Sequence, residues 1–335
     1  MSPPDSPPAA SPRPPLVWGA LFIVYVVWGS TYLAIKVAIE TMPPLLMAGA
    51  RFAIAGGLLY GLLRLQGRRL GGLVPWRNAF LVGTALLAGG NGGVSWAEQT
   101  VPSGIAALVI GSVPLWFALV DWVRPGGTAP SRRTWTGIAL GFAGLGILGA
   151  PAVAGQPVDP AGFAVLLVAC VFWASGSIYS RHTPNPGSPW LTVGAQMLCG
   201  GLVLLVASAV SGEAATFDWR GVSARSFWAL VYLIVAGSWI GFSAYIWLLR
   251  ATTPARVSSY AYVNPVVAVL LGWAVLGEPL TPRIGIAATV ILTGVIALTL
   301  PARRPTRPPC EGPAGDPCSS ETIPDSTRTA RETPG

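Results

Sequence analysis

The chain has 335 residues, of which 52% are hydrophobic and only 10% are charged. A soluble globular protein carries about 25% charged residues, so this composition excludes an ordinary soluble domain and favours a lipid bilayer as the surroundings. The net charge of +8 does not indicate a nucleic-acid partner, because the basic residues are spread over the loops between apolar segments.

Ten apolar segments follow one another along the chain, and their runs are continuous rather than alternating. A helix of about 20 apolar residues matches the ~30 Å hydrocarbon core of a bilayer, whereas barrel strands would alternate. We therefore predict an all-α membrane protein with ten transmembrane helices. In chain order, these begin near Leu16, Pro44, Arg77, Pro102, Arg132, Ala161, Trp190, Ser226, Pro254 and Thr281.

Two polar segments flank the apolar part. Residues 1–15 are rich in proline, and residues 301–335 mix proline with charged and hydroxyl side chains. Neither segment can bury enough apolar surface to offset the entropy of ordering, so both are predicted to be disordered tails. The helices then form two groups of five, in residues 16–150 and 160–300.

The distribution of basic residues predicts the orientation in the membrane. With the N-terminus inside, sixteen Lys and Arg residues fall on the cytoplasmic side and three in the outer loops, and the remaining two of the 21 lie within helices or at their ends. Basic residues are enriched in cytoplasmic loops. Both termini are therefore expected to be cytoplasmic.

Motifs for catalysis or nucleotide binding are missing from the sequence. The only histidine is His182, there is no H-E-x-x-H motif, and no phosphate-binding P-loop occurs. We expect no enzyme activity, no cofactor, no metal site and no direct use of ATP.

The second half of the chain repeats landmarks of the first half. Trp28-Gly29-Ser30 matches Trp173-Ala174-Ser175 at an offset of 145 residues, as Gly49-Ala50 matches Gly194-Ala195. Pro114 matches Pro265 at an offset of 151. Because each half holds an odd number of helices, the second half must enter the membrane inverted. Inverted repeats are typical of carriers, whose site lies between the repeats near the bilayer midplane.

Three stretches resemble a known family. They are residues 26–60 (VVWGSTYLAIKVAIETMPPLLMAGARFAIAGGLLY), residues 90–116 (GNGGVSWAEQTVPSGIAALVIGSVPLW) and residues 263–281 (VNPVVAVLLGWAVLGEPLT). All three resemble EamA-type members of the drug/metabolite transporter superfamily. The resemblance implies a bacterial inner-membrane carrier with two inverted EamA repeats, in residues 16–150 and 160–300. Members of that family move amino acids, other metabolites or amphipathic drugs, often outward.

Polar and aromatic residues near the middle of their predicted helices are the candidates for a substrate site. A polar side chain in hydrocarbon needs an internal partner or a water-filled cavity. A serine often bonds its own helix backbone, and a tryptophan often serves packing, so structural roles remain open for these residue types. The predicted substrate-binding residues are Trp28, Ser30, Asn91, Trp173, Ser175, Trp239 and Asn264.

The two asparagines have neighbours that disturb a helix. Asn91 lies between pairs of glycines, and Asn264 precedes Pro265. A proline inside a helix frees one backbone carbonyl, and broken helices at the midplane indicate a transport site. We therefore favour a functional role for both asparagines, and a hinge role for Pro114 and Pro265.

Charged residues near the predicted helices are few. Arg51 lies about seven residues, or ~10 Å, into the second helix. Its counterpart in the second half is the uncharged Gln196, so we expect Arg51 to form a structural ion pair with Glu98 or Glu278. No acidic residue occupies the middle of the first or sixth helix, which speaks against simple proton-coupled cation export.

Together these patterns predict an inner-membrane exporter of small neutral, zwitterionic or amphipathic metabolites that resemble amino acids, working by alternating access. The alternatives are a proton-coupled multidrug exporter and a membrane scaffold without transport activity. Since both repeats lie on one chain, a monomer is sufficient to build the site, although a dimer is possible. The expected partners are a small-molecule substrate and the bilayer.

Overall fold

The computed structural model describes residues 14–150, 158–183, 188–252, 254–257 and 259–299, and these residues contain helices but no strand. The predicted tail at residues 301–335 and residues 1–13 of the other tail lie outside the described residues. Pro14 and Pro15 already belong to the first helix.

The first repeat contains a helix at each of its five predicted ranges. The third is one continuous helix whose central part has π-helical geometry, and the fourth is divided at Ser112. The elements are α1 (Pro14–Ala38), α2 (Pro44–Leu65), α3 (Leu73–Gly83), η1 (Thr84–Gly92), α4 (Gly93–Ala97), α5 (Ser103–Gly111), α6 (Val113–Val123) and α7 (Arg132–Gly149).

The second repeat has the same plan, with short extra turns before its third helix. The elements are α8 (Pro160–His182), α9 (Pro189–Val210), α10 (Glu213–Thr216), η2 (Trp219–Gly221), α11 (Ala224–Tyr232), η3 (Leu233–Ile240), α12 (Gly241–Ala251), α13 (Pro254–Val257), α14 (Tyr260–Leu276) and α15 (Pro282–Thr299).

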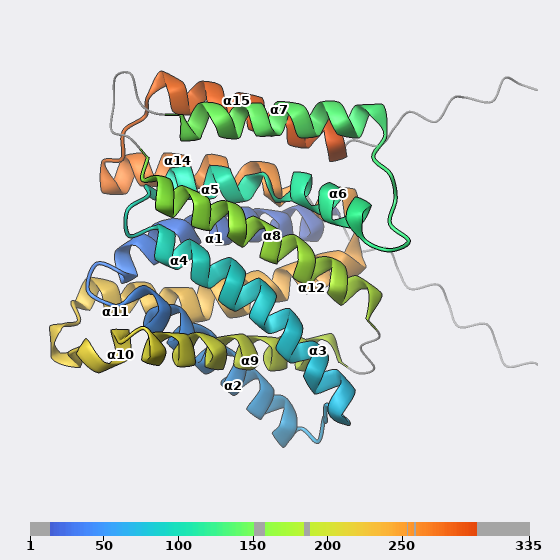
Figure 1. Ribbon diagram of the computed structural model, residues 1–335. Coiled ribbons are helices and arrows are strands. Elements are labelled where there is room, and N and C mark those ends of the chain that lie inside the picture. The colour runs from blue at the N-terminus through green and yellow to red at the C-terminus, as the bar shows by residue number, and fades with distance from the viewer. Residues whose placement is uncertain (1–13, 151–157, 184–187, 253, 258, 300–335) are drawn as a thin grey trace, which may run out of the picture. The chain divides into compact units, whose positions relative to one another are not determined.

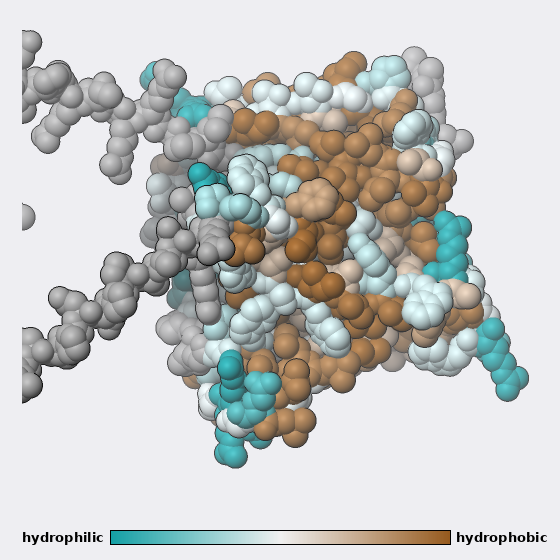
Figure 2. All heavy atoms as spheres, turned by 180° about the vertical axis from the view of Figure 1, so that it is seen from behind, coloured by the Kyte–Doolittle hydropathy of each residue, from teal (hydrophilic) through white to brown (hydrophobic). Residues whose placement is uncertain are grey.

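Six of these helical stretches are long and apolar enough to cross a membrane. Hydrophobic side chains dominate the middle of the face shown in Figure 2, and strongly hydrophilic ones lie toward its left and right margins. The structure is therefore that of an all-helical, multi-pass membrane protein. The six stretches are Pro14–Ala38, Pro44–Leu65, Ser103–Val123, Pro160–His182, Pro189–Val210 and Ala224–Leu248.

The packing of the helices is symmetric under exchange of the two repeats. Two helices pack on their own counterparts, α2 on α9 and α7 on α15, and α5 packs on α14; each of these pairs lies side by side in Figure 1. The first helix of each repeat crosses to the other repeat, since α1 packs on α12 and α14 while α8 packs on η1 and α6. The interface between the repeats thus forms the centre of the protein.

Two π-helical segments occur at corresponding places in the repeats. In η1 the side-chain amide of Asn91 donates to the carbonyl of Leu86 at 3.4 Å. In η3 the hydroxyl of Ser238 donates to the carbonyl of Leu233 at 3.1 Å. Both bonds reach back five residues, and both residue pairs are separated by an offset of 147. Such π segments are rare and are often found at functional sites.

The two prolines predicted as hinges differ in their surroundings. Pro114 follows Ser112, the residue at which α5 ends and α6 begins. Pro265 lies inside α14, whose helix continues through it. The end of α5 lies close to Pro265, because a Cβ added at Gly111 would lie 2.7 Å from Cγ of Pro265.

Charged side chains close the ends of several helices. Glu213 accepts bonds from the amides of Leu45 and Leu46 at the start of α2. The guanidinium of Arg283 donates to carbonyls at the end of α7, including that of Leu148 at 3.0 Å. Anions at helix N-termini and cations at C-termini are both favoured by the helix dipole.

Candidate functional site

Each repeat places a tryptophan against the π segment of the other repeat. The indole Nε1 of Trp28 on α1 donates to the carbonyl of Gly237 in η3 at 3.2 Å. Trp173 on α8 lies so close to Gly90 in η1 that an added Cβ would be 2.8 Å from its ring. The offset between the tryptophans is 145 and that between the glycines is 147. The sequence match of Trp28 and Trp173 therefore corresponds to a duplicated contact.

Three consecutive residues of η3 contact the first two helices. Besides the carbonyl of Gly237, Ser238 accepts a bond from Nε of Arg51 at 3.2 Å, and Nε1 of Trp239 donates to the carbonyl of Ala55 at 3.1 Å. We call Trp28, Arg51, Gly237 and Ser238 the Arg51 half-site, and their counterparts Trp173, Gln196, Gly90 and Asn91 the Gln196 half-site.

Arg51 is 4% exposed, and its guanidinium carbon lies 4.5 Å from the ring centre of Phe52. The structure does not bring Arg51 to Glu98 or Glu278, and no ion pair of Arg51 occurs within the described residues. A buried charge without an ionic partner is costly. A charge in that position within a membrane protein indicates a pathway or a ligand site.

The Gln196 half-site borders a small, mostly apolar pocket. Trp173 and Gln196 line it together with aliphatic residues of η1, α3 and α9, and Phe242 of α12. Because Gln196 is the counterpart of Arg51, the two half-sites differ at this position by a full charge. The remaining lining residues are Val82, Gly83, Leu86, Leu87, Val193 and Met197.

Phe242 connects the two half-sites. Its ring centre lies 5.2 Å from that of Trp28, and the same residue lines the pocket beside Trp173. Trp28 also meets Tyr245 at 5.2 Å and Tyr260 at 5.3 Å between ring centres. These three aromatic residues were not predicted from the sequence. Phe242 and Tyr245 could have been found from their spacing of three residues, which places both on one face of a helix.

Asn264 is 8% exposed and lies next to this aromatic cluster. With its amide oriented so that the nitrogen faces the carbonyls, it donates to Tyr25 at 3.3 Å and to Tyr260 at 3.2 Å. Trp28 and Asn264 therefore both contact Tyr260. Asn91, in contrast, bonds to its own helix through Leu86.

The two predicted serines have different surroundings. The hydroxyl of Ser30 donates to the carbonyl of Val27 at 2.9 Å and lies 2.7 Å from the hydroxyl of Tyr232, so it joins α1 to α11. Ser175 is half-buried, and the described residues give it no hydrogen bond. Ser30 therefore fits a structural contact between helices.

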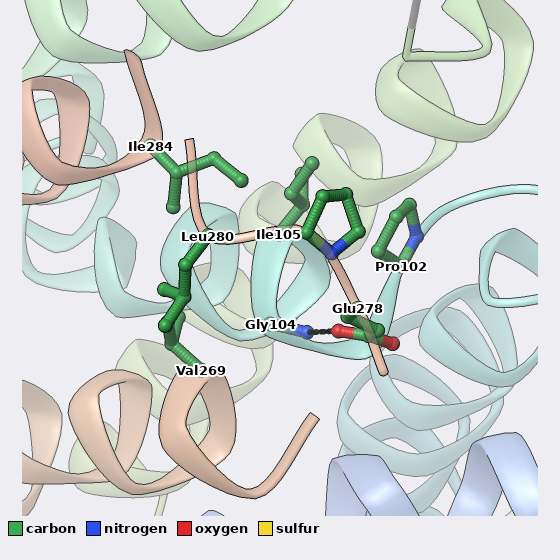
Figure 3. A pocket seen from close by; sticks show the side chains of 8 residues that line it. Pro102, Gly104, Ile105, Val269, Glu278, Leu280 and Ile284 are labelled. Carbon is green, nitrogen blue, oxygen red and sulfur yellow. Dashed lines mark hydrogen bonds between the residues drawn. The ribbon is translucent and has the colours of Figure 1, made fainter. Parts of the chain in front are cut away.

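Glu98 directly follows α4, and Glu278 lies two residues after the end of α14. Glu278 accepts bonds from the amides of Ser103 at 2.7 Å and Gly104 at 3.0 Å, and so caps α5 (Figure 3). Glu98 is fully buried, and neither carboxylate oxygen has a hydrogen-bond donor among the described residues. An ion pair of Arg51 with Glu98 or Glu278 was expected from the sequence, and the described residues contain neither pair.

The arrangement combines apolar ring faces with one buried cation and a few amides. A pocket that is mostly apolar, with few orienting polar groups, is typical of small-molecule sites. Within the described residues no group of His, Cys, Asp and Glu could hold a metal ion.

Comparisons with known proteins identify the class of protein. The EamA-like transporter family matches residues 17–150 and 160–300, one match for each repeat. The chain belongs to the EamA-like transporter family, and it is a transporter rather than an enzyme.

Relatives of the chain agree with this class. The chain is 44% identical over 286 residues to the "Uncharacterized inner membrane transporter YedA" of Escherichia coli (strain K12), covering 85% of this chain and 90% of that one. It is 27% identical to the "Probable amino-acid metabolite efflux pump" of Salmonella typhimurium, over 82% and 91% of the two chains. A solved crystal structure has the same fold with a TM-score of 0.57 at 22% identity, covering 86% of this chain and 98% of that one.

Proposed function

We propose that the protein exports small zwitterionic or amphipathic metabolites that resemble amino acids, by alternating access at a site between the repeats. The observation that carries the proposal is the pair of half-sites around Phe242. They combine apolar ring faces with the buried cation Arg51. The relative named as an amino-acid metabolite efflux pump supports the same substrate class.

In this proposal the guanidinium of Arg51 binds the carboxylate of the substrate. Arg51 has no acidic partner within the described residues, and its fork of donors matches a carboxylate. Trp28, Trp173 and Phe242 contact the apolar part of the substrate. The ammonium group of a zwitterion meets ring faces and carbonyls, which attract a cation.

The proposed architecture has ten membrane-spanning helices in two inverted repeats, with both termini in the cytoplasm. Support comes from the exchange symmetry of the helix contacts and from the distribution of the basic residues. Single cysteines in residues 64–77 should react with an impermeant reagent only from the cytoplasm, and one in residues 151–159 only from outside. Labelling of residue 68 from outside would contradict this orientation.

The transport activity is tested by counterflow with purified protein in liposomes. Amino acids, their decarboxylated amines and amphipathic cations are compared, each with and without a pH gradient. We expect saturable counterflow of amino acids and at least about tenfold weaker counterflow of the amines, since a lost charged hydrogen bond costs ~1.5–3 kcal/mol. Equal transport of acids and amines would contradict the role of Arg51.

Two other functions remain as outcomes of the same experiment. A proton-coupled multidrug exporter would move amphipathic cations only when the gradient is present. A scaffold would give no saturable flux with any compound. The buried cation beside the aromatic cluster disfavours cationic substrates, because like charges repel in a low dielectric.

A further inference from the structure

Glu98 differs from the other acidic groups at its end of the molecule because no described residue donates a hydrogen bond to its carboxylate. It follows α4, is 0% exposed, and neither carboxylate oxygen accepts a hydrogen bond from a described residue. An ionised carboxylate without donors is strongly disfavoured away from water. Burial without a donor among the described residues therefore favours the neutral form of the Glu98 carboxyl.

Nearby acids show the contrast. Asp159 accepts bonds from the hydroxyl of Thr100 at 2.6 Å and the amide of Gly162 at 3.0 Å. These two donors hold the pKa of Asp159 below its usual range. Glu278 accepts two amides at the start of α5. Asp159 and Glu278 thus have the donors that an anion needs, and Glu98 has none among the residues that the structure describes.

The charged and titratable groups around Glu98 come from several elements. On α1 these are Tyr32 and Lys36, and beyond α14 there is Glu278. Lys36 attracts the charge of Glu98 and Glu278 repels it. Cys170 belongs to α8, Asp159 caps the start of α8, and Arg51 of α2 is bonded to Ser238. The residues of α5 include no titratable group.

Lys36 does not form an ion pair with the carboxylate. Its ammonium donates instead to backbone carbonyls of Glu98, Gln99 (3.5 Å) and Val101 (3.4 Å). These bonds attach α1 to the end of α4 and to the loop that follows. The side chain of Glu98 is fully buried next to the contact that Lys36 makes with the Glu98 carbonyl.

We propose that Glu98 is a proton-binding site, and that a proton on its carboxylate allows this end of the protein to close. When α1 separates from the loop at residues 98–101, water reaches Glu98 and the proton can leave. Closure then requires a proton from the same side, which the proposed topology makes the outer side. The inference rests on the proposed carrier function and adds to it a control by outer pH.

The first test measures exposure of this end without any substrate. Val101 is 0% exposed and is replaced by cysteine in a chain whose four native cysteines are removed. Labelling by an impermeant maleimide is followed from the outer side between about pH 5 and pH 9, the range over which buried carboxyls titrate. Each rate is divided by the rate of the same protein carrying Glu98→Gln, which removes the common effect of thiol ionisation.

We expect this ratio to rise about tenfold or more with pH, because Glu98→Gln keeps the neutral shape and stays closed. Asp159→Asn is the matched control and should leave the pH profile of the ratio unchanged, whereas Glu278→Gln removes a repelling charge and should shift the profile toward lower pH. A ratio that stays constant over the whole range would overturn the proposal. So would a loss of the profile in the Asp159→Asn variant.

A second measurement covers the case in which Glu98→Gln does not fold. Infrared spectroscopy of the wild-type protein should show the carbonyl band of a neutral carboxylic acid near neutral pH and its loss as pH rises. Absence of that band at about pH 7 would overturn the proposal, since a buried carboxyl should titrate higher. Counterflow with a flat labelling profile would leave the carrier function and remove the proton site, whereas a titrating Glu98 without counterflow would do the reverse.

Discussion

The Arg51 half-site and the Gln196 half-site are built from corresponding helices but carry different side chains. In both, a tryptophan from the first helix of one repeat contacts a glycine of the π segment of the other repeat: Trp28 donates to the carbonyl of Gly237, and the ring of Trp173 packs on Gly90. The Arg51 half-site is filled by aromatic rings and a cation, while the Gln196 half-site borders an apolar pocket. The duplication therefore conserves the framework that brings the repeats together, and the differing side chains determine what each half can bind.

The change with the largest expected effect makes the two half-sites alike. Arg51→Gln places in α2 the residue that α9 already has at this position. Removing a charged hydrogen bond costs ~1.5–3 kcal/mol, so counterflow affinity for amino acids should fall about ten- to hundredfold. Affinity for decarboxylated amines should not fall.

The matched control is Arg283→Gln, which removes an arginine that bonds to the end of α7 away from the half-sites. It should lower thermal stability without changing the preference for carboxylates. The same loss for acids and amines in Arg51→Gln would mean that Arg51 serves only the packing of η3.

The next prediction concerns Asn264 beside the Arg51 half-site. Asn264→Ala removes the donor to the carbonyls of Tyr25 and Tyr260. Loss of such a buried bond costs ~1–3 kcal/mol, so apparent affinity should weaken roughly tenfold. Counterflow and a thermal melt are measured on the same samples. A large loss of stability with unchanged kinetics per folded molecule would assign Asn264 to packing.

A smaller effect is expected from filling the contact in the Gln196 half-site. A Cβ in Gly90→Ala would lie 2.8 Å from the ring of Trp173, so the ring must move toward the pocket. Overpacking of this kind costs ~1–3 kcal/mol of stability, part of which the adjoining pocket can relieve. Gly61→Ala is the control, because nothing lies within 4 Å of its added Cβ. Transport that tolerates Gly90→Ala as well as Gly61→Ala would exclude Trp173 from the site.

The smallest effect distinguishes the two tryptophans. Trp28→Phe removes the bond from Nε1 to Gly237, which is worth ~0.5–1.5 kcal/mol. For Trp173 no corresponding bond occurs within the described residues, so Trp173→Phe should cost less stability. Thermal melts of the two variants measure this difference. Equal losses would show that ring size, and not the bond to η3, determines the role of Trp28.

Part of this arrangement could be predicted from the sequence. The apolar segments, the repeat and the pairing of Trp28 with Trp173 depend on local composition and on spacing, which a single sequence records. The family expected from the resemblance is confirmed by matches to both repeats. Asn91 and Asn264 were selected because glycine and proline often mark an irregular helix. The helix is π-helical at Asn91, whereas α14 continues through Pro265.

Other features depend on contacts between distant segments. The π geometry of η1 and η3 was not predicted, because an extra residue per turn leaves no clear mark in local composition. The ion pair expected between Arg51 and Glu98 could not be judged from depth along the helices alone. Arg51 turns toward Ser238, and Lys36 bonds to backbone carbonyls instead of the carboxylate of Glu98. Phe242 was overlooked because its role follows from contact with both repeats.

The central claim is that the two half-sites bind one substrate molecule together. Cysteines are placed singly at Ser238 and Gln196, and an impermeant maleimide is applied while the amino acid with the strongest counterflow is titrated. We predict that this amino acid slows labelling at both positions with the same half-saturating concentration. Protection of only one position, or two different half-saturating concentrations, would contradict a single shared site.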